Sequence, residues 1–236
     1  RCCLSKISNI QVISCGPGLK EINKNHGVSS DWIQSMMKSR VPDIQVVRSY
    51  LDESPSFESN SAWVIMGSRY SAYDHMDWID RLKNNILKAI KLEIPILGIC
   101  FGHQILCKAL GANVANNPEG WEIGSSEVFL SDKGLSSPIF KGFSPNFYVY
   151  QSHHDVVSDL PDNLDLLCSN KFGVQSISYK DLVFGVQFHP EFSYDVMKAY
   201  FDIRTQDLRG FDYSVLNKND GNKIVGNFIN IILKED

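Results

Sequence analysis

Apolar runs alternate with amphipathic segments through the first half of the chain. The run over 61–68 is apolar enough to form a strand buried on both faces of a sheet. The segment over 77–92 carries its apolar residues on one stripe at helical spacing, which predicts a helix with one buried face. Because such strands and helices alternate, we expect a parallel sheet with helices on both faces. Strands are predicted over 9–16, 43–51, 61–68 and 94–99, and helices over 29–39, 77–92 and from Cys100 to Gly111.

Short strands bounded by turn residues dominate the second half of the chain. Two helices are predicted after them, over 193–204 and 222–234, with a surface loop over 205–221 between them. No linker or internal repeat divides the chain, so we predict a single α/β domain over 1–236. The strands of this half are predicted over 127–131, 146–153, 164–170, 174–180 and 183–191.

Composition and charge argue against several classes of function. The chain has 236 residues, with 23 Lys and Arg, 27 Asp and Glu, and a formal net charge of -4. The basic residues are scattered rather than clustered, so we expect no nucleic-acid partner. No apolar run approaches the roughly 20 residues that a membrane-spanning helix needs, and no secretory signal is evident. We therefore expect no membrane association.

Six cysteines are dispersed along the chain without a C-x-x-C pair. This pattern argues against a zinc ribbon and predicts a reduced, cytoplasmic protein. We interpret the adjacent Cys2 and Cys3 as incidental, with a lipidation or oxidation site as the alternative. The chain contains no glycine-rich phosphate loop of the P-loop type, so ATP is not an expected ligand and we predict no cofactor.

One strand-to-helix corner has the form of a nucleophile elbow. The strand ends in Gly98-Ile99-Cys100-Phe101-Gly102, and a helical pattern follows at once. The glycines permit a sharp, crowded turn, and the unpaired N–H groups and dipole of the new helix favour a thiolate at Cys100. The alternative interpretation is that the glycines only permit tight packing and that Cys100 is a small buried apolar residue.

A histidine and a glutamate two residues apart form the second candidate. In an extended segment such residues project to the same side, so Glu191 is predicted to hold one ring nitrogen of His189 while the other faces Cys100. Pro190 would stiffen the link between them. The alternative is an exposed histidine at a strand end, with no partner in the chemistry.

The two candidates together resemble a known family. The segments LGICFGHQ, 97–104, and GVQFHPE, 185–191, resemble the two signature motifs of class I glutamine amidotransferases. The resemblance covers roughly residues 12–200. It implies an open, mostly parallel, flavodoxin-like sheet flanked by helices, with extra antiparallel strands in the second half. It also implies a catalytic triad in which Cys100 is the nucleophile, His189 the base and Glu191 the residue that orients it.

The resemblance also implies the oxyanion donors. The backbone N–H of Phe101 is one expected donor, and the Gly67–Ser68 region supplies the other. The segment MGSRYSAYD, 66–74, stands where biosynthetic members of the family usually show a Gly-Gly-Pro loop. This departure bears on the partner and the natural substrate rather than on the chemistry.

Three further residues are expected to bind substrate. Gln104 matches the glutamine of the family's GHQ motif, and helical spacing places its amide near the thiol. The segment YQSHHDVV, 150–157, resembles the strand that holds the α-amino and α-carboxylate groups of the substrate. Within it Ser152 and Asp155 match polar positions, and Asp155 is a natural partner for an ammonium group.

The same segment contains His153, His154 and Asp155, which are possible metal ligands, but its geometry argues against a metal site. His153 and His154 are adjacent, and neighbouring side chains on a strand point to opposite faces, so both cannot easily serve one metal. Cys100 and His189 are better explained as nucleophile and base than as metal ligands. We therefore predict no metal site.

The expected activity is cysteine-dependent acyl transfer from a γ-glutamyl amide through a thioester on Cys100. The glycine loop resembles a stand-alone branch that includes plant γ-glutamyl peptidases, so the substrate is expected to be glutamine or a γ-glutamyl peptide. One alternative is a glutaminase subunit that feeds ammonia to a separate synthase. Another is an inactive regulatory or binding module of the same fold.

Overall fold

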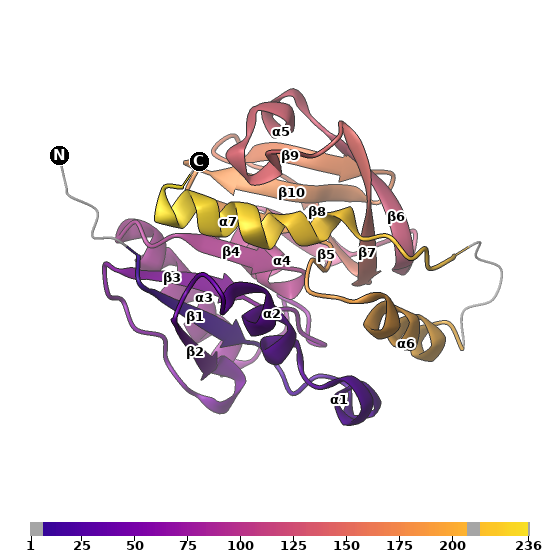
Figure 1. The fold of residues 1–236 in the computed structure, drawn as a ribbon, viewed down its shortest axis with the longest axis horizontal. Helices are drawn as coiled ribbons and strands as arrows, with labels where there is room; N and C mark the ends of the chain where they lie inside the picture. Colours follow the sequence, from indigo (N-terminus) through magenta and orange to yellow (C-terminus); the bar gives the residue numbers. More distant parts are fainter. Residues whose placement is uncertain (1–6, 207–212, 236) are drawn as a thin grey trace.

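The computed structural model describes residues 7–206 and 213–235 of the chain. Cys2 and Cys3, which we interpreted as incidental, lie outside the described residues, as does part of the predicted loop over 205–221. Within the described residues, a nine-stranded sheet runs through the molecule in the order β2-β1-β3-β4-β11-β10-β9-β6-β7 (Figure 1). A separate two-stranded sheet pairs β5 with β8.

The first part of the large sheet is parallel and carries the predicted apolar strands. β1 pairs in parallel with β2 and β3, β3 with β4, and β4 with β11. Strands buried on both faces are typical of such a sheet, and β1, β3, β4 and β11 are fully buried along their length. The bounds are β1 (Asn9–Ser14), β2 (Asp43–Arg48), β3 (Ser61–Ile65), β4 (Ile96–Ile99) and β11 (Val183–Val186).

The second part of the sheet is antiparallel, as the family resemblance implies, and it is built from the strands that the sequence of this half predicts. β10 pairs with β11 and β9, and β6 pairs with β9 and β7. β6 is longer than the strand predicted over 127–131, and the short strands β5 and β8 were not predicted. The bounds are β5 (Asn113–Asn116), β6 (Glu122–Leu130), β7 (Asn146–His153), β8 (Asp155–Asp159), β9 (Asp165–Asn170) and β10 (Gly173–Tyr179).

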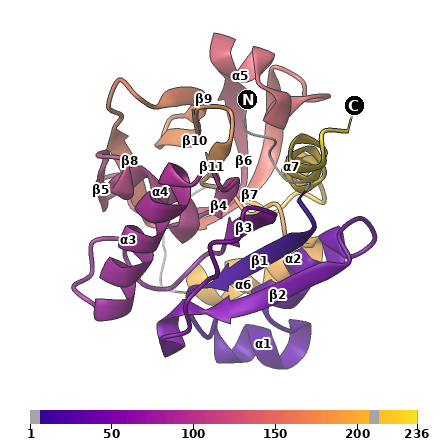
Figure 2. The same ribbon diagram turned by 90° about the vertical axis from the view of Figure 1, so that its left-hand side faces the viewer.

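Helices cover both faces of the parallel part, as predicted. α3 (Asp77–Lys91) and α4 (Phe101–Ala109) lie on one face, and α7 (Lys223–Leu233) lies on the other beside α2 (Ser29–Met37) (Figure 2). Alternate residues of β3 serve the two layers: Ala62 and Val64 pack toward α2 and α7, and Trp63 and Ile65 pack toward α3 and α4. This two-sided burial explains why the apolar run over 61–68 shows no polar alternation.

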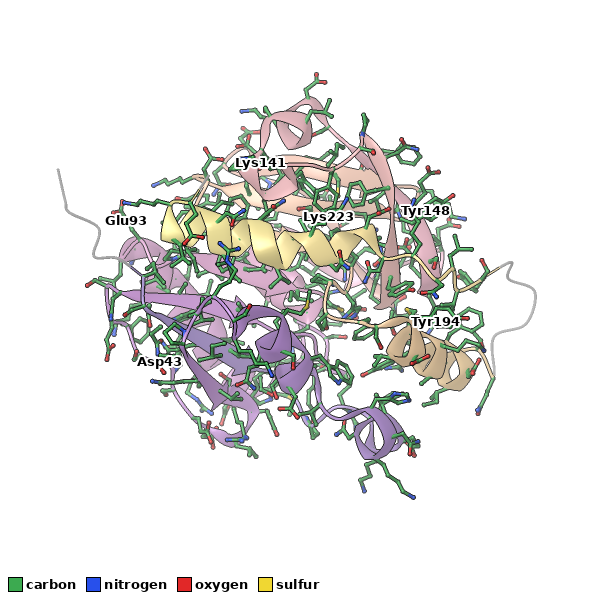
Figure 3. All side chains as sticks on the ribbon, viewed as in Figure 1. Asp43, Glu93, Lys141, Tyr148, Tyr194 and Lys223 are labelled. Carbon is green, nitrogen blue, oxygen red and sulfur yellow. The ribbon has the colours of Figure 1, made fainter. Side chains whose placement is uncertain are left out.

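The remaining helices are short or stand at the edge of the sheet. α1 (Lys20–His26) was not predicted, because its sequence is polar and buries only Ile22. α6 (Tyr194–Arg204) begins at the residue labelled Tyr194 in Figure 3. α5 (Asp132–Ser136) is short, and 3₁₀ turns span Ser49–Leu51, Pro138–Phe140 and Asp220–Asn222. Among the described residues, no helix is long and apolar enough to cross a membrane.

The parallel strands bring four chain segments to one edge of the sheet. β1, β3, β4 and β11 are mutually parallel, so the residues that follow them meet at their carboxyl ends. α1 and α6 contact one another at this edge (Figure 1). In open α/β sheets, ligands bind outside the carboxyl ends of the strands, so this edge is the first place to look for a site.

Candidate active site

Cys100 occupies a strained corner between β4 and α4. Its backbone has φ 53° and ψ -105°, in the positive-φ region that a non-glycine residue rarely adopts. Its N–H donates to the carbonyl of Val186 on β11 at 2.9 Å, which fixes the corner to the sheet. The residue is 5% exposed. The corner therefore has the strand–turn–helix form predicted for a nucleophile elbow.

The flanking glycines are required by close packing. A Cβ at Gly98 would lie 2.5 Å from the carbonyl oxygen of Gly102, and a Cβ at Gly102 would lie 2.1 Å from the carbonyl oxygen of Ile65. Both distances are too short for any side chain. The packing interpretation of these glycines is thus correct, and it coexists with the strained Cys100 between them rather than replacing it.

His189 and Glu191 are joined by a hydrogen bond, but not in the way their spacing predicted. The predicted strand over 183–191 is wrong at its end, because β11 stops at Val186 and both residues lie in the following turn. His189 Nδ1 nevertheless lies 2.9 Å from Glu191 Oε1, and both side chains are almost fully buried. Pro190 cannot donate to a sheet ladder, which is consistent with a turn at this position.

The charges around His189 favour its protonated form. Burial alone would lower the pKa of the imidazole, but the Glu191 carboxylate and the Cys100 sulfur outweigh it and raise the pKa to about 10. No regular hydrogen bond joins His189 Nε2 to another atom of the described chain. A Cβ at Gly67 would lie 3.3 Å from His189 Cε1 and 3.6 Å from Cys100 Cβ, which places the imidazole and the thiol against the same small residue.

Aromatic stacking and a distant asparagine hold the His189 turn, and sequence reasoning missed both. Phe192 stacks on the imidazole at 4.0 Å between ring centroids, and Tyr200 stacks on Phe192 at 4.9 Å. Asn219 Nδ2 donates to the carbonyls of His189 and Phe192 at 3.1 and 3.3 Å. Nothing in the sequence pattern marks Phe192 or Tyr200 as a neighbour of His189, and Asn219 falls within the predicted surface loop. An Asn-Asp-Gly cluster before an apolar helix was the only signal there.

The loop after β3 lies beside Cys100. The Ser68 hydroxyl donates to the Cys15 carbonyl at 2.6 Å and accepts from the Tyr70 N–H at 3.2 Å, so the side chain is engaged in holding the loop. Phe101 is the first residue of α4, where an N–H has no acceptor within the helix. Gly67 and Ser68 line the same cavity as Cys100, and Phe101 follows Cys100 directly in the chain. The oxyanion role of these three residues stays a prediction.

Gln104 and Asp155, two of the three predicted substrate-binding residues, line the part of the site away from His189, whereas Ser152 lines both parts. The Gln104 amide donates to the Asp155 carbonyl at 3.0 Å and to Gln187 Oε1 at 3.1 Å. The Asp155 carboxylate accepts from the Ser71 hydroxyl at 2.5 Å and from the Tyr73 hydroxyl at 2.9 Å. These bonds fix Gln104 and Asp155 in the wall and leave part of the carboxylate's capacity to accept hydrogen bonds.

His153 and His154 have separate surroundings. His153 Nε2 lies 2.8 Å from the buried carboxylate of Glu122. Asn170 and Gln175 donate to the same carboxylate at 2.6 and 2.9 Å. The ring of His154 lies 5.2 Å from that of Trp121, away from this network. The two histidines therefore have different partners: His153 pairs with Glu122, and His154 lies against Trp121.

The site opens into a two-sided cavity centred on Cys100. One side, the His189 side, is lined by His189, Glu191 and residues of the segment before α1; the other, the Asp155 side, is lined by Gln104, Asp155 and residues of the loop after β3. Residues that line both sides are Ser68, Arg69, Cys100, Ser152 and Arg204.

Buried polar atoms without a partner in the described chain collect in this cavity. They are His189 Nε2, Glu191 Oε2, Ser152 Oγ and Arg204 Nε. Buried polar groups are normally hydrogen-bonded, so a cluster of unsatisfied atoms at one cavity indicates a place for a polar ligand. Arg204 was not singled out from the sequence.

Comparisons with known proteins identify the family of this chain. The family model described as Glutamine amidotransferase class-I matches residues 24–202. Gamma-glutamyl peptidase 4 of Arabidopsis thaliana is 32% identical over 169 residues, which are 70% of this chain and 66% of the relative. A glutamine-hydrolyzing GMP synthase subunit of Methanothermobacter thermautotrophicus is 40% identical over 115 residues, which are 48% of this chain and 60% of the relative.

A solved structure gives the same fold over nearly the whole chain. The glutamine amidotransferase of Methylobacillus flagellatus has a TM-score of 0.74 at 18% identity, covering 97% of this chain and 95% of that one. The elbow, the parallel sheet and the match over most of the length place the chain in one class. The chain belongs to the class I glutamine amidotransferase family, a family of hydrolytic and amide-transferring enzymes.

Proposed function

We propose that the protein hydrolyses γ-glutamyl amides through a γ-glutamyl thioester on Cys100. The observation that carries this proposal is the approach of a buried His189–Glu191 pair to a thiol held at a strained elbow. The raised pKa of His189 supports a protonated imidazole beside Cys100, which provides a proton donor near neutral pH. Family membership supports the same reaction class.

The reaction begins with attack by the Cys100 thiolate on the carbonyl carbon of the γ-glutamyl amide. The negative charge that develops on the carbonyl oxygen is stabilised by N–H groups of Phe101 and of the Gly67–Ser68 loop. His189, aligned by Glu191, then gives its Nε2 proton to the leaving amine as the C–N bond breaks. The products of this half-reaction are a free amine and a thioester on Cys100.

Water completes the cycle by attacking the thioester. His189, now neutral, takes a proton from that water, and collapse of the second tetrahedral intermediate releases glutamate and restores the Cys100 thiolate. On the Asp155 side, we propose that the Asp155 carboxylate holds the α-ammonium of the glutamyl group. Gln104 and Ser152 flank the same group, and the unsatisfied Ser152 hydroxyl is available to it.

Glutamate release by the purified chain tests this function. The assay offers glutamine and a γ-glutamyl dipeptide separately, with Cys100→Ala as the control. Release from either substrate that is lost in Cys100→Ala supports the proposal. Absence of release, together with a Cys100 that resists alkylation by a glutamine-like electrophile, would contradict it and favour an inactive module of the same fold.

A second candidate function is that of a glutaminase component working with a separate synthase. The observation that favours it is the similarity to a glutamine-hydrolyzing subunit of GMP synthase. In that case glutamine is the substrate and ammonia passes to the partner. Silence of the isolated chain toward both substrates, with Cys100 still alkylated by the electrophile, is the result expected for a glutaminase that its partner activates.

A further inference from the structure

Two hydroxyl groups tie the loop after β3 to the carboxylate of Asp155. This inference rests on the proposed function, in which the Gly67–Ser68 part of the loop stabilises the oxyanion and Asp155 holds the α-ammonium of the glutamyl group. The Ser71 hydroxyl donates to Asp155 Oδ2 at 2.5 Å, and the Tyr73 hydroxyl donates to Asp155 Oδ1 at 2.9 Å. Each carboxylate oxygen therefore accepts one hydroxyl of the loop.

The loop is anchored on both sides of its proposed oxyanion donors. Ahead of the turn, the Ser68 hydroxyl donates to the Cys15 carbonyl at 2.6 Å. Beyond it, the Ser71 N–H donates to the Asp74 carboxylate at 2.9 Å, and the Asp74 N–H donates back to the Ser71 carbonyl at 3.0 Å. This closed turn presents the hydroxyls of Ser71 and Tyr73 together. Because Ser71 follows Ser68 by three residues, its bond to Asp155 restricts the position of the Gly67–Ser68 backbone.

The backbone of Asp155 is fixed independently of the loop. Its carbonyl accepts from the Gln104 amide at 3.0 Å and lies 3.0 Å from His153 Nδ1. The other ring nitrogen of His153 lies 2.8 Å from the fully buried carboxylate of Glu122. Asp155 is therefore a rigid point to which a loop can be tied.

The Asp155 carboxylate also keeps room for a ligand. An ionised carboxylate accepts about four hydrogen bonds, so the two hydroxyls of the loop leave part of that capacity to an ammonium group. His154 Nδ1 lies 3.7 Å from Asp155 Oδ1, which is too far for a hydrogen bond. Asp155 and Ser71 both line the Asp155 side of the cavity. One carboxylate thus serves the loop and the cavity together.

We propose that Ser71 and Tyr73 are positioning residues that couple substrate recognition to oxyanion stabilisation through the Asp155 carboxylate. The same two hydrogen bonds orient that carboxylate for the α-ammonium and hold the Gly67–Ser68 backbone beside Cys100. Donors stabilise a developing charge best when their positions are fixed before the reaction. Loss of the two hydroxyls should therefore slow the chemical step as well as weaken binding.

The test is the double variant Ser71→Ala/Tyr73→Phe, assayed for glutamate release from glutamine and from γ-glutamylglycine. For the better substrate, kcat is expected to fall about tenfold to a hundredfold and KM to rise severalfold, because both lost bonds end on a charged group. Ser35→Ala, which removes an exposed hydroxyl bonded to the Asp31 carbonyl on α2, is the control and should change neither constant. Each variant is assayed below its thermal unfolding midpoint, so that unfolded protein is not counted as a loss of rate.

Variants of Asp155 show whether the hydroxyls act through its carboxylate. Asp155→Ala removes the shared partner, so adding Ser71→Ala/Tyr73→Phe to it should lower kcat/KM by less than about threefold further. Asp155→Asn loses the charge, but its amide can exchange hydrogen bonds with both hydroxyls. It should therefore retain a higher kcat than Asp155→Ala.

Two results would overturn the inference and leave hydrolysis standing. An unchanged kcat in the folded double variant, with or without a higher KM, would mean that the hydroxyls do not hold the oxyanion donors. A loss in the Asp155→Ala background as large as the loss in the wild-type background would mean that they act independently of Asp155. No glutamate release from either substrate by the wild type would overturn the proposed function, and this inference with it.

Discussion

The nucleophile and its base are positioned by different means. Cys100 is held by backbone geometry: a positive φ, a hydrogen bond to Val186 and two glycines that touch neighbouring backbone. His189 is held by side chains: the Glu191 carboxylate, the stacked ring of Phe192 and the amide of Asn219. A change near Cys100 should therefore disturb the fold, whereas a change near His189 should disturb the chemistry first.

Removal of the thiol is expected to have the largest effect on activity. Cys100→Ala should reduce glutamate release by at least about a thousandfold, because no other group in the account forms the acyl intermediate. The alanine fits the same corner, so the thermal unfolding midpoint should stay within a few degrees of the wild type. A folded Cys100→Ala that keeps a tenth of the activity is incompatible with the mechanism.

A methyl group at Gly102 tests whether backbone packing positions Cys100. Gly102→Ala places a Cβ 2.1 Å from the Ile65 carbonyl and should destabilise the protein by about 3 kcal/mol, with activity lost in proportion to the unfolded fraction. Gly226→Ala on α7 is the matched control, since a Cβ there meets nothing within 4 Å and should be neutral or stabilising by up to about 1 kcal/mol. Urea unfolding of both variants measures the difference.

Loss of the Glu191 charge tests whether side chains position His189. Glu191→Gln should reduce kcat about a hundredfold, because the imidazole loses the carboxylate that orients it and keeps it protonated. The wild-type rate should fall as pH rises through about 10, where His189 loses its proton, and in Glu191→Gln this fall should move to lower pH. A pH profile of kcat/KM for each of the two proteins measures where its alkaline fall lies. An unchanged alkaline limb in the variant would show that Glu191 does not set the titration.

The same pKa shift carries a smaller effect on stability. Because the folded-state pKa of His189 lies above its ordinary value of 6.5, its contribution to stability is complete below that pH and is lost as pH rises toward 10. The loss should be smaller in Glu191→Gln. Urea unfolding of the two proteins at pH 6 and pH 9 makes the comparison, and equal losses would mean that the pair contributes no pH-dependent stability.

Asn219→Ala should have the smallest effect. The variant removes two hydrogen bonds to the His189 turn and should cost about 1 kcal/mol of stability and a severalfold loss in kcat, with KM little changed. Asn113→Ala, which removes a surface side-chain hydrogen bond to Ser158, is the control. A KM effect without a kcat effect would mean that the turn acts in binding rather than in proton transfer.

The difference between the two regions also explains what the sequence could predict. The elbow follows from local rules, since glycines around a cysteine at a strand end have few structural solutions. The layered sheet follows from the alternation of apolar strands with amphipathic helices along the chain. The pairing of His189 with Glu191 was predicted for the wrong local reason, because a strand was assigned where the chain turns. Tyr200 and Arg204 reach the site only through tertiary packing, and no local pattern distinguishes them from ordinary helix residues. Asn219 also reaches the site through tertiary packing, and the Asn-Asp-Gly cluster that contains it indicates a turn but not a contact with His189.

The most direct test of the account is to trap the acyl-enzyme. Wild-type protein is quenched in acid during turnover of a γ-glutamyl peptide, digested, and mapped by mass spectrometry. We predict a γ-glutamyl adduct on Cys100 that disappears when the sample is treated with hydroxylamine. Continued release of glutamate with no adduct on Cys100, or an adduct on another cysteine, would contradict the central claim that Cys100 is the nucleophile.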